Sequence, residues 1–266
     1  QQTSCFTSMA ASSLFSIALV HHKGKFVAVK ESRGWYLPAG KVDRGEGFAT
    51  AGCRECVEEA GIDIILERLL RVDFTQRGGT RMRCIFLARP KDPKSPLKTV
   101  PDEESEFAKW LTAKEYDAVP SSELRGAEGP RLISWASALI EDKKLEYFPP
   151  VQGVLEETEF SKIDREYKRV NVTYGLACVI RTKSGDTVWD TTESSGCLPY
   201  IRLSGGITFL PTFKKKLHVQ LGVKKDDVVL DGVLKIVFKA TSIDDADCRV
   251  IFLAKLKKGV KLDTKK

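Results

Sequence analysis

Three glutamates in the first half of the chain have a spacing that brings their carboxylates together. Glu55, Glu58 and Glu59 occupy positions i, i+3 and i+4, and on an α-helix these positions share one face within a single turn. Like charges at this spacing destabilise an isolated helix by about 0.2–0.5 kcal/mol per pair. A hard divalent cation removes the repulsion, because Mg²⁺ binds oxygen ligands and is commonly held by carboxylates together with substrate phosphate. The spacing therefore predicts a site for a metal ion and a phosphate group.

The residues around the glutamates predict a short helix with a defined start and end. Four apolar residues would form a buried stripe opposite the glutamates: Phe48, Ala51, Cys56 and Ala60. Three glycines before the helix are expected to allow tight turns: Gly40, Gly45 and Gly47. Gly61 is placed to end the helix as a left-handed cap. Arg54, next to Glu55, is expected to orient a carboxylate through charge-assisted hydrogen bonds.

The whole run is similar to the Nudix box. In that motif a glycine, five residues, a glutamate and seven residues precede Arg-Glu-apolar-any-Glu-Glu-any-Gly-apolar. Every fixed position is met in this chain, by Gly40, Glu46, Arg54, Glu55, Glu58, Glu59 and Gly61. Cys56 fills a slot that is usually aliphatic. The resemblance implies a hydrolase with the α/β Nudix fold, an α/β/α sandwich around a mixed sheet.

The resemblance also implies roles for individual residues. The catalytic candidates are Glu46, Arg54, Glu55, Glu58 and Glu59. The metal ligands for Mg²⁺ or Mn²⁺ would be Glu55, Glu58, Glu59 and the backbone carbonyl of Ala39. The general base varies within the family, so its identity stays open. Nudix enzymes often add an acidic group upstream of a tryptophan, and Glu104, six residues before Trp110, is the candidate ligand there. A solvated acidic loop is the alternative interpretation of Glu104.

Nudix enzymes hydrolyse a nucleoside diphosphate linked to another group. Water attacks phosphorus, while metal ions stabilise charge on the phosphoryl oxygens. The segments 35–41 and 86–90 resemble the branch that converts 8-oxoguanine nucleoside diphosphates to monophosphates, which implies a role in nucleotide-pool sanitation. Base recognition is then expected from the loops around residues 20–36 and 110–125.

Other substrates and a second class of function stay open at this point. The alternative substrates are ADP-ribose, NADH, coenzyme A, diadenosine polyphosphates and capped RNA. Arg77 stands where ADP-ribose enzymes tend to carry a proline, which disfavours that substrate. Some Nudix-fold proteins are non-catalytic binders of RNA or protein, but such proteins usually lose the glutamates that this chain keeps. The three histidines offer little material for a catalytic triad or a zinc site.

Composition indicates the compartment and the kinds of partner that are expected for the chain. The seven cysteines are scattered and odd in number, which favours free thiols and a reducing, cytoplasmic compartment. No run of 18 apolar residues occurs, so no membrane span or membrane partner is expected. The net charge is +7, yet no long basic block dominates, so a nucleic-acid partner is not favoured. Because the chain begins with Gln1, the native N-terminus is expected to lie upstream.

Hydrophobic patterning predicts the elements that position these residues. Strands are expected over residues 14–20, 26–29, 64–73 and 82–88, and an amphipathic helix is expected over residues 131–142. Phe148-Pro149-Pro150 marks a boundary. The charged segment 156–169 after it is expected to be helical. The catalytic domain is thus assigned to residues 1–145 and a linker with a helix to residues 146–172.

The chain also repeats itself, which predicts a second Nudix-like copy in residues 173–266. Residues 197–223 align with residues 36–62 without a gap, residues 249–254 resemble residues 83–88, and residues 174–181 resemble the first strand. The box residues are replaced in this copy, by Ile207, Lys215, Lys216, Val219 and Gln220. The second copy is therefore expected to be degenerate and metal-free. Its expected role is to pack against the first domain, close its cleft or form a homodimer. The lysines at 214–216 are a weaker candidate for an anion site.

Overall fold

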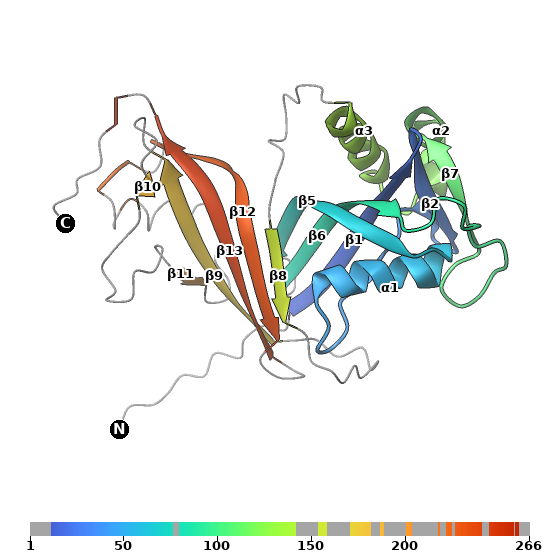
Figure 1. The fold of residues 1–266 in the computed structure, drawn as a ribbon, viewed down its shortest axis with the longest axis horizontal. Helices are drawn as coiled ribbons and strands as arrows, with labels where there is room; N and C mark the ends of the chain where they lie inside the picture. Colours follow the sequence, from blue (N-terminus) through green and yellow to red (C-terminus); the bar gives the residue numbers. More distant parts are fainter. Residues whose placement is uncertain are drawn as a thin grey trace.

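The computed structural model describes residues 12–76, 80–141, 154–158, 171–181, 187–188, 201–203, 218, 222–224, 227–240, 245–257 and 259–260. These residues form two β-sheets that follow one another along the chain (Figure 1). The described helices pack with the first sheet, and Glu55, Glu58 and Glu59 lie on one of them. None of the described helices is long and apolar enough to cross a membrane.

The first sheet is mixed and has seven strands. Its main path runs β3-β2-β1-β6-β5, with β4 paired to β1 and β7 paired to β2. The central strands β1 and β6 are parallel, while the other pairs are antiparallel. The strands are β1 (Ser12–His22), β2 (Lys25–Glu31), β3 (Gly34–Tyr36), β4 (Ala39–Lys41), β5 (Ile64–Gln76), β6 (Thr80–Pro90) and β7 (Phe107–Thr112).

Helices cover both faces of this sheet. They are α1 (Phe48–Ala60), α2 (Ala113–Asp117), the 3₁₀ helix η1 (Ser121–Glu123) and α3 (Gly129–Ile140). Successive side chains of a strand point to opposite faces. Accordingly Leu19 packs in the core with Trp135 of α3, whereas Ala18 packs in a separate core with Cys56 of α1. The architecture is the α/β/α sandwich that the motif implied, with α1 crossing the sheet on one side (Figure 1).

The strands expected over residues 14–20, 26–29, 64–73 and 82–88 are confirmed as the cores of β1, β2, β5 and β6. The helix expected over residues 131–142 is confirmed as α3, which begins two residues earlier. Sequence patterning missed the short elements β3, β4, β7 and α2. A signal for α2 was present, because Thr112 and Glu115 form a capping box at its start.

The second sheet contains six strands. Its path is β10-β9-β13-β12-β8, with β11 paired to β9. The strands are β8 (Val154–Thr158), β9 (Asn171–Arg181), β10 (Thr187–Val188), β11 (Ile201–Leu203), β12 (Val228–Ala240) and β13 (Asp245–Leu256). This sheet is also mixed: β9 is parallel to β13 and β8 is parallel to β12, while the other pairs are antiparallel.

The helix expected over residues 156–169 is wrong at its beginning, because residues 154–158 form strand β8. This strand pairs in parallel with β12, with Glu156 beside Val237 and Glu157 beside Phe238. Tertiary strand pairing thus overrides the helix preference of the glutamates. The rest of that segment, residues 159–169, lies outside the described residues. So do the replaced box positions 207, 215, 216, 219 and 220 and the lysines at 214–216.

Candidate active site

Helix α1 carries most of the candidate residues, and its two ends are fixed as the sequence indicated. The helix ends at Gly61, whose φ of 74° is left-handed and whose N–H donates to the Val57 carbonyl at 3.1 Å. The next N–H, from Ile62, donates to the Cys56 carbonyl at 3.3 Å. The predicted apolar stripe is fully buried, at Phe48, Ala51, Cys56 and Ala60. The opposite face of the helix therefore presents the glutamates.

Strand β4 approaches the carboxylate of Glu55 closely. A Cβ atom added to Gly40 would lie 1.8 Å from Glu55 Oε1 and 2.0 Å from its Cδ. Gly40 is thus required by this approach, and its interpretation as a turn residue is wrong, because it lies within β4. The same correction applies to Gly47, which is extended at φ −97°. Only Gly45 among the three takes a positive φ, of 76°.

Arg54 connects three carboxylates of the box. Its Nε and Nη2 atoms donate to the two oxygens of Glu46, each at 3.0 Å. Its Nη1 atom donates to Glu55 Oε1 and to Glu58 Oε2, each at 2.8 Å. Burial lowers the pKa of the Arg54 guanidinium, but the hydrogen bonds and charges of these glutamates outweigh burial and raise it. Arg54 is therefore a permanently charged group that fixes the positions of its three partners.

Glu59 lies deeper than the other candidate metal ligands on α1. Its side chain is buried, and its Oε2 atom accepts a hydrogen bond from the backbone N–H of Ala39 at 2.9 Å. This bond brings the backbone N–H of Ala39 to the glutamate cluster, while the role of its carbonyl as a metal ligand stays a prediction. Burial raises the pKa of Glu59 well above its usual range, although the Ala39 hydrogen bond acts in the opposite direction.

Negative charge accumulates at this end of the site. Burial raises the pKa of Glu55 to about 7; Arg54 opposes the shift, and the charges of Glu58 and Glu104 add to it. The pKa of Glu104 is raised as well, by partial burial and then by the charge of Glu58. Glu104 therefore lies within electrostatic reach of the cluster, although it belongs to an exposed loop. The fold brings together the sequence candidates on α1, β4 and this loop.

The donor set suits a hard divalent cation. In the described part of the chain no three His, Cys, Asp or Glu side chains converge with metal-ligand geometry. Arg54 instead donates to both Glu55 and Glu58. The available donors are carboxylates and a backbone carbonyl, which Mg²⁺ and Mn²⁺ prefer. Burial and mutual repulsion raise the pKa values of Glu55 and Glu59 and so disfavour their charged forms, and a cation bound at this point would favour the ionised carboxylates again.

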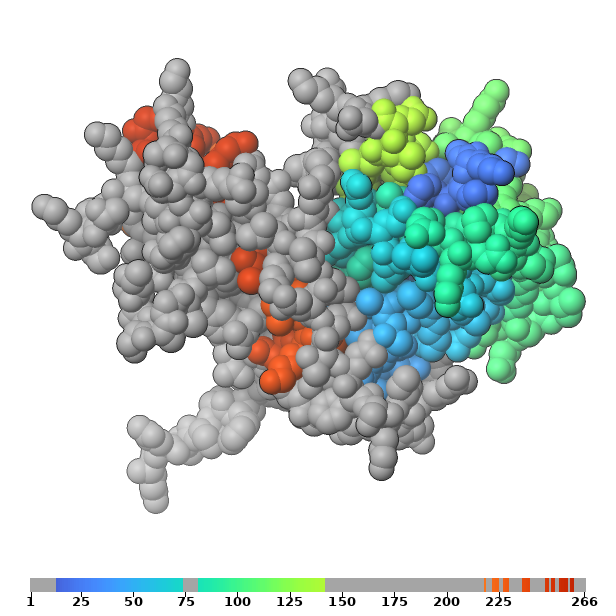
Figure 2. Space-filling view, viewed as in Figure 1, coloured from blue at the N-terminus to red at the C-terminus, as the bar shows by residue number. Residues whose placement is uncertain are grey.

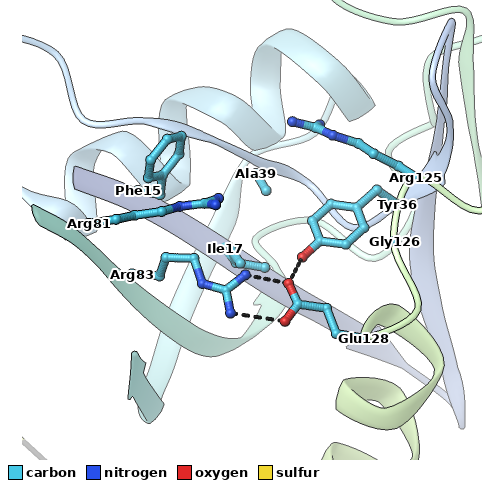
Figure 3. A pocket seen from close by; sticks show the side chains of 9 residues that line it. All are labelled: Phe15, Ile17, Tyr36, Ala39, Arg81, Arg83, Arg125, Gly126 and Glu128. Carbon is cyan, nitrogen blue, oxygen red and sulfur yellow. Dashed lines mark hydrogen bonds and ion pairs between the residues drawn. The ribbon is translucent and has the colours of Figure 1, made fainter. Parts of the chain in front are cut away.

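A cavity of about 210 Å³ opens next to this cluster, with Ala39 in its wall (Figure 3). It is lined by Phe15, Ile17, Tyr36, Ala39, Arg81, Arg83, Arg125, Gly126 and Glu128. Glu128 is the acceptor at its centre, because Tyr36 Oη donates to Oε1 at 2.6 Å and Arg83 donates to both oxygens. Arginines also lie over both aromatic rings: Arg81 is 4.4 Å from the centroid of Phe15, and Arg125 is 5.4 Å from that of Tyr36.

Sequence reasoning found little of this cavity. Of the lining residues only Tyr36 and Arg125 fall in the segments expected to bind the base. The remainder come from β1, β4, β6 and the residues just before α3. One feature of the sequence could have indicated part of the cavity: Arg81 and Arg83 are two residues apart on one strand, so their side chains lie on the same face of the sheet. Glu128 could not be found in this way, because its neighbours Tyr36 and Arg83 are distant in sequence.

Comparison with known proteins agrees with the geometry. Residues 13–132 match the NUDIX domain model, so this part of the chain is a NUDIX domain. The segment is 43% identical over 84 residues to the human protein named 8-oxo-dGDP phosphatase NUDT18, which covers 31% of this chain and 25% of that protein. It is 36% identical over 110 residues to putative nudix hydrolase 1 of Caenorhabditis elegans, covering 41% of this chain and 29% of that protein.

The chain thus spans about a quarter of the length of the curated relatives that it matches. Among solved structures, a NUDIX hydrolase from Nitrosomonas europaea matches with a TM-score of 0.41 and 22% sequence identity. That match covers 52% of this chain and 97% of the bacterial protein.

Proposed function

We propose that the NUDIX domain hydrolyses nucleoside diphosphates in a metal-dependent reaction, with 8-oxoguanine nucleoside diphosphates as the substrates and the monophosphates as products. One observation carries the proposal: the glutamate cluster of α1 and the charged, aromatic cavity meet at Ala39. A diphosphate at the cluster would place its nucleoside in the cavity. Hydrolysis of this kind would remove oxidised nucleotides from the precursor pool.

Different residues would bind the metal at the diphosphate and hold the metal ligands in place. Glu55, Glu58, Glu59 and the Ala39 carbonyl would hold Mg²⁺ or Mn²⁺, with Glu104 as a further acidic group. When bound, the cation stabilises charge on the phosphoryl oxygens and lowers the pKa of the attacking water. Arg54 holds Glu55 and Glu58 in place, and the buried Glu46 in turn holds Arg54 through two hydrogen bonds. This arrangement preorganises the ligands before the substrate arrives.

The cavity offers the chemistry that an oxidised guanine needs. Guanine carries an acceptor at N7, whereas 8-oxoguanine carries an N7–H donor and a carbonyl oxygen at C8. Glu128 is an acceptor, since three hydrogen-bond donors hold its carboxylate and its pKa stays lowered despite partial burial. Arg81 and Arg83 are donors, and Phe15 and Tyr36 offer rings for stacking. The name of the human relative supports the same substrate.

A nucleotide panel tests the proposal. We expect hydrolysis with Mg²⁺, followed by chromatography of the nucleotide products, to be faster for 8-oxo-dGDP than for dGDP, 8-oxo-dGTP, ADP-ribose, NADH or coenzyme A. A preference for ADP-ribose or a dinucleotide would show that the chain is a Nudix pyrophosphatase of another kind. Absence of turnover, together with RNA or protein binding, would favour the non-catalytic alternative.

We also propose a cellular compartment for this activity. Within the described residues, Cys56 of α1 is a buried cysteine that forms no disulfide. This agrees with a reducing, cytoplasmic compartment.

A further inference from the structure

We propose that the second sheet is a metal-free internal copy of the first, and that it docks on the first as the other half of a pseudo-symmetric pair. In this position its Phe238 supports the beginning of the metal-binding helix α1. The inference depends on the proposed function only because α1 carries the proposed metal ligands.

The pairing among β1, β6, β5 and β4 in the first sheet matches the pairing among β9, β13, β12 and β11 in the second, register by register. In the first sheet β1 is parallel to β6, with Ser16 opposite Cys84. In the second sheet β9 is parallel to β13, with Leu176 opposite Val250. These two pairs stand at the positions that the sequence repeat predicts. The short strands agree as well, because β4 places Gly40 opposite Ser16 and β11 places Ile201 opposite Leu176.

Two irregularities recur at equivalent places. The pairing of β5 with β6 shifts register between Leu66 and Arg68 and again between Leu69 and Arg71. The pairing of β12 with β13 shifts between Leu230 and Gly232 and again between Val233 and Lys235. In both sheets the first shift follows the pairing with an equivalent alanine, Ala88 in β6 and Ala254 in β13. A β-bulge breaks the pairing at a specific residue, so two coincident bulges are strong evidence of a shared fold.

The end of the box helix has a counterpart too. Gly222 stands where the repeat places the equivalent of Gly61. Its φ is 67°, against 74° for Gly61, and its N–H donates to the carbonyl of His218 four residues earlier at 3.0 Å. Since the box carboxylates are replaced in this copy, it keeps the framework and lacks the acidic ligands.

The two copies meet through equivalent residues. Met82 Sδ of β6 lies 3.7 Å from Cys248 Sγ of β13, and both residues are buried. These positions are equivalent, because Met82 pairs with Phe74 and Leu14 while Cys248 pairs with Phe238 and Tyr174. In a two-fold interface a residue on the axis meets its own counterpart. The pseudo-two-fold axis therefore passes between Met82 and Cys248.

The docked sheet lies against the metal-binding helix. Strand β8 contacts both α1 and β5 (Figure 1). The space-filling view shows α1, in light blue, on the side of the first domain that faces the orange-red residues of the second sheet (Figure 2). The ring of Phe238 packs edge-on against Phe48, with centroids 5.1 Å apart and an interplanar angle of 71°. Phe48 is the first residue of α1, seven residues before Glu55, so Phe238 acts as a positioning residue.

Hydrogen exchange in the full-length chain tests this role without requiring turnover. We expect Phe238→Ala to speed exchange of the α1 amides by roughly 2- to 10-fold, as loss of an aromatic pair should, while Phe238→Leu has a smaller effect. The matched control is Val237→Ala, which removes apolar volume from the opposite face of β12. Unchanged α1 exchange in a folded Phe238→Ala chain would overturn the proposal. If that variant does not fold, the same measurement on Phe238→Leu decides.

A disulfide tests the pseudo-symmetric docking directly. Met82→Cys would put a thiol opposite Cys248, with its sulfur one bond further back than Met82 Sδ, and mild oxidation is expected to join position 82 to Cys248 within one chain. Peptide mapping by mass spectrometry identifies the bond, and the Met82→Cys, Cys248→Ser chain is the control. Absence of this bond, or disulfide-linked dimers in its place, would overturn the docking. Neither outcome depends on whether the enzyme accepts 8-oxo-dGDP.

Discussion

The guanidinium of Arg54 is the point through which the acidic residues of the site are connected. It donates to Glu46, Glu55 and Glu58, and Glu46 is buried with both oxygens engaged. Glu46 therefore positions Arg54, and Glu55 and Glu58 remain free at their other oxygens to approach a cation. These different roles of the carboxylates explain why one arginine and four glutamates can share a small volume.

Replacement of Glu58 by glutamine tests the ligand role with little change in shape. Glu58→Gln removes one negative charge, while the amide oxygen can still accept from Arg54. We expect the turnover number to fall at least about 100-fold, since even residues behind metal ligands contribute about 10- to 100-fold. Phosphate release at saturating Mg²⁺ measures the effect, and circular dichroism verifies the fold. The control is Glu123→Gln on an exposed turn; turnover of Glu58→Gln at the wild-type rate would refute the assigned role.

Glu128 offers a test of base recognition. Glu128→Gln replaces an acceptor-only carboxylate by an amide that also carries donors, and it weakens the charge-assisted bond from Arg83. We expect the ratio of kcat/KM for 8-oxo-dGDP over dGDP to fall roughly 10-fold, corresponding to loss of one good hydrogen bond to a charged group. Competition between the two nucleotides measures the ratio. Unchanged discrimination, with the exposed Glu123→Gln as reference, would place base recognition elsewhere.

At the level of elements, the glycine after α1 determines where the helix ends. Gly61 takes a φ of 74°, and a Cβ atom there would also lie 3.2 Å from the backbone nitrogen of Lys98. Gly61→Ala is therefore expected to lower the free energy of unfolding by about 1–2 kcal/mol. Urea denaturation measures the loss. Gly126→Ala is the matched control, because a Cβ atom there meets nothing within 4 Å; equal midpoints for the two variants would contradict the expectation.

The elements also show which features can be predicted from a single sequence. Helix α1, its apolar stripe and its left-handed cap follow from local periodicity and one glycine. The contact of Gly40 with Glu55 does not, because it joins β4 to a helix and depends on how they pack. The cavity is missed for the same reason, since Glu128 meets Tyr36 and Arg83 only in the folded chain. Strand β8 was misassigned because its partner β12 lies far away in sequence.

For the whole molecule, buried residues of the first domain contact buried residues of the second sheet. Phe48 packs on Phe238, and Met82 packs on Cys248. Both contacts involve elements that carry residues of the candidate site. Phe48 is the first residue of α1, and Met82 lies on β6 between Arg81 and Arg83. If the proposed docking holds, the stability of the second half is coupled to the geometry of the proposed metal ligands and of the cavity.

Metal binding at the glutamate cluster should therefore stabilise the whole chain, by an amount that grows with the logarithm of the free metal concentration. A ligand at 100 times its dissociation constant stabilises the folded state by about 2.7 kcal/mol, which for a chain of this size raises the unfolding midpoint by roughly 5–10 °C. We expect Mn²⁺ to produce this shift and EDTA to reverse it. Gly40→Ala should abolish the shift, because its Cβ atom would occupy the place of the Glu55 carboxylate, whereas Gly126→Ala should retain it. A shift of equal size in Gly40→Ala would mean that Mn²⁺ binds outside the cluster, and the metal site would have to be reassigned.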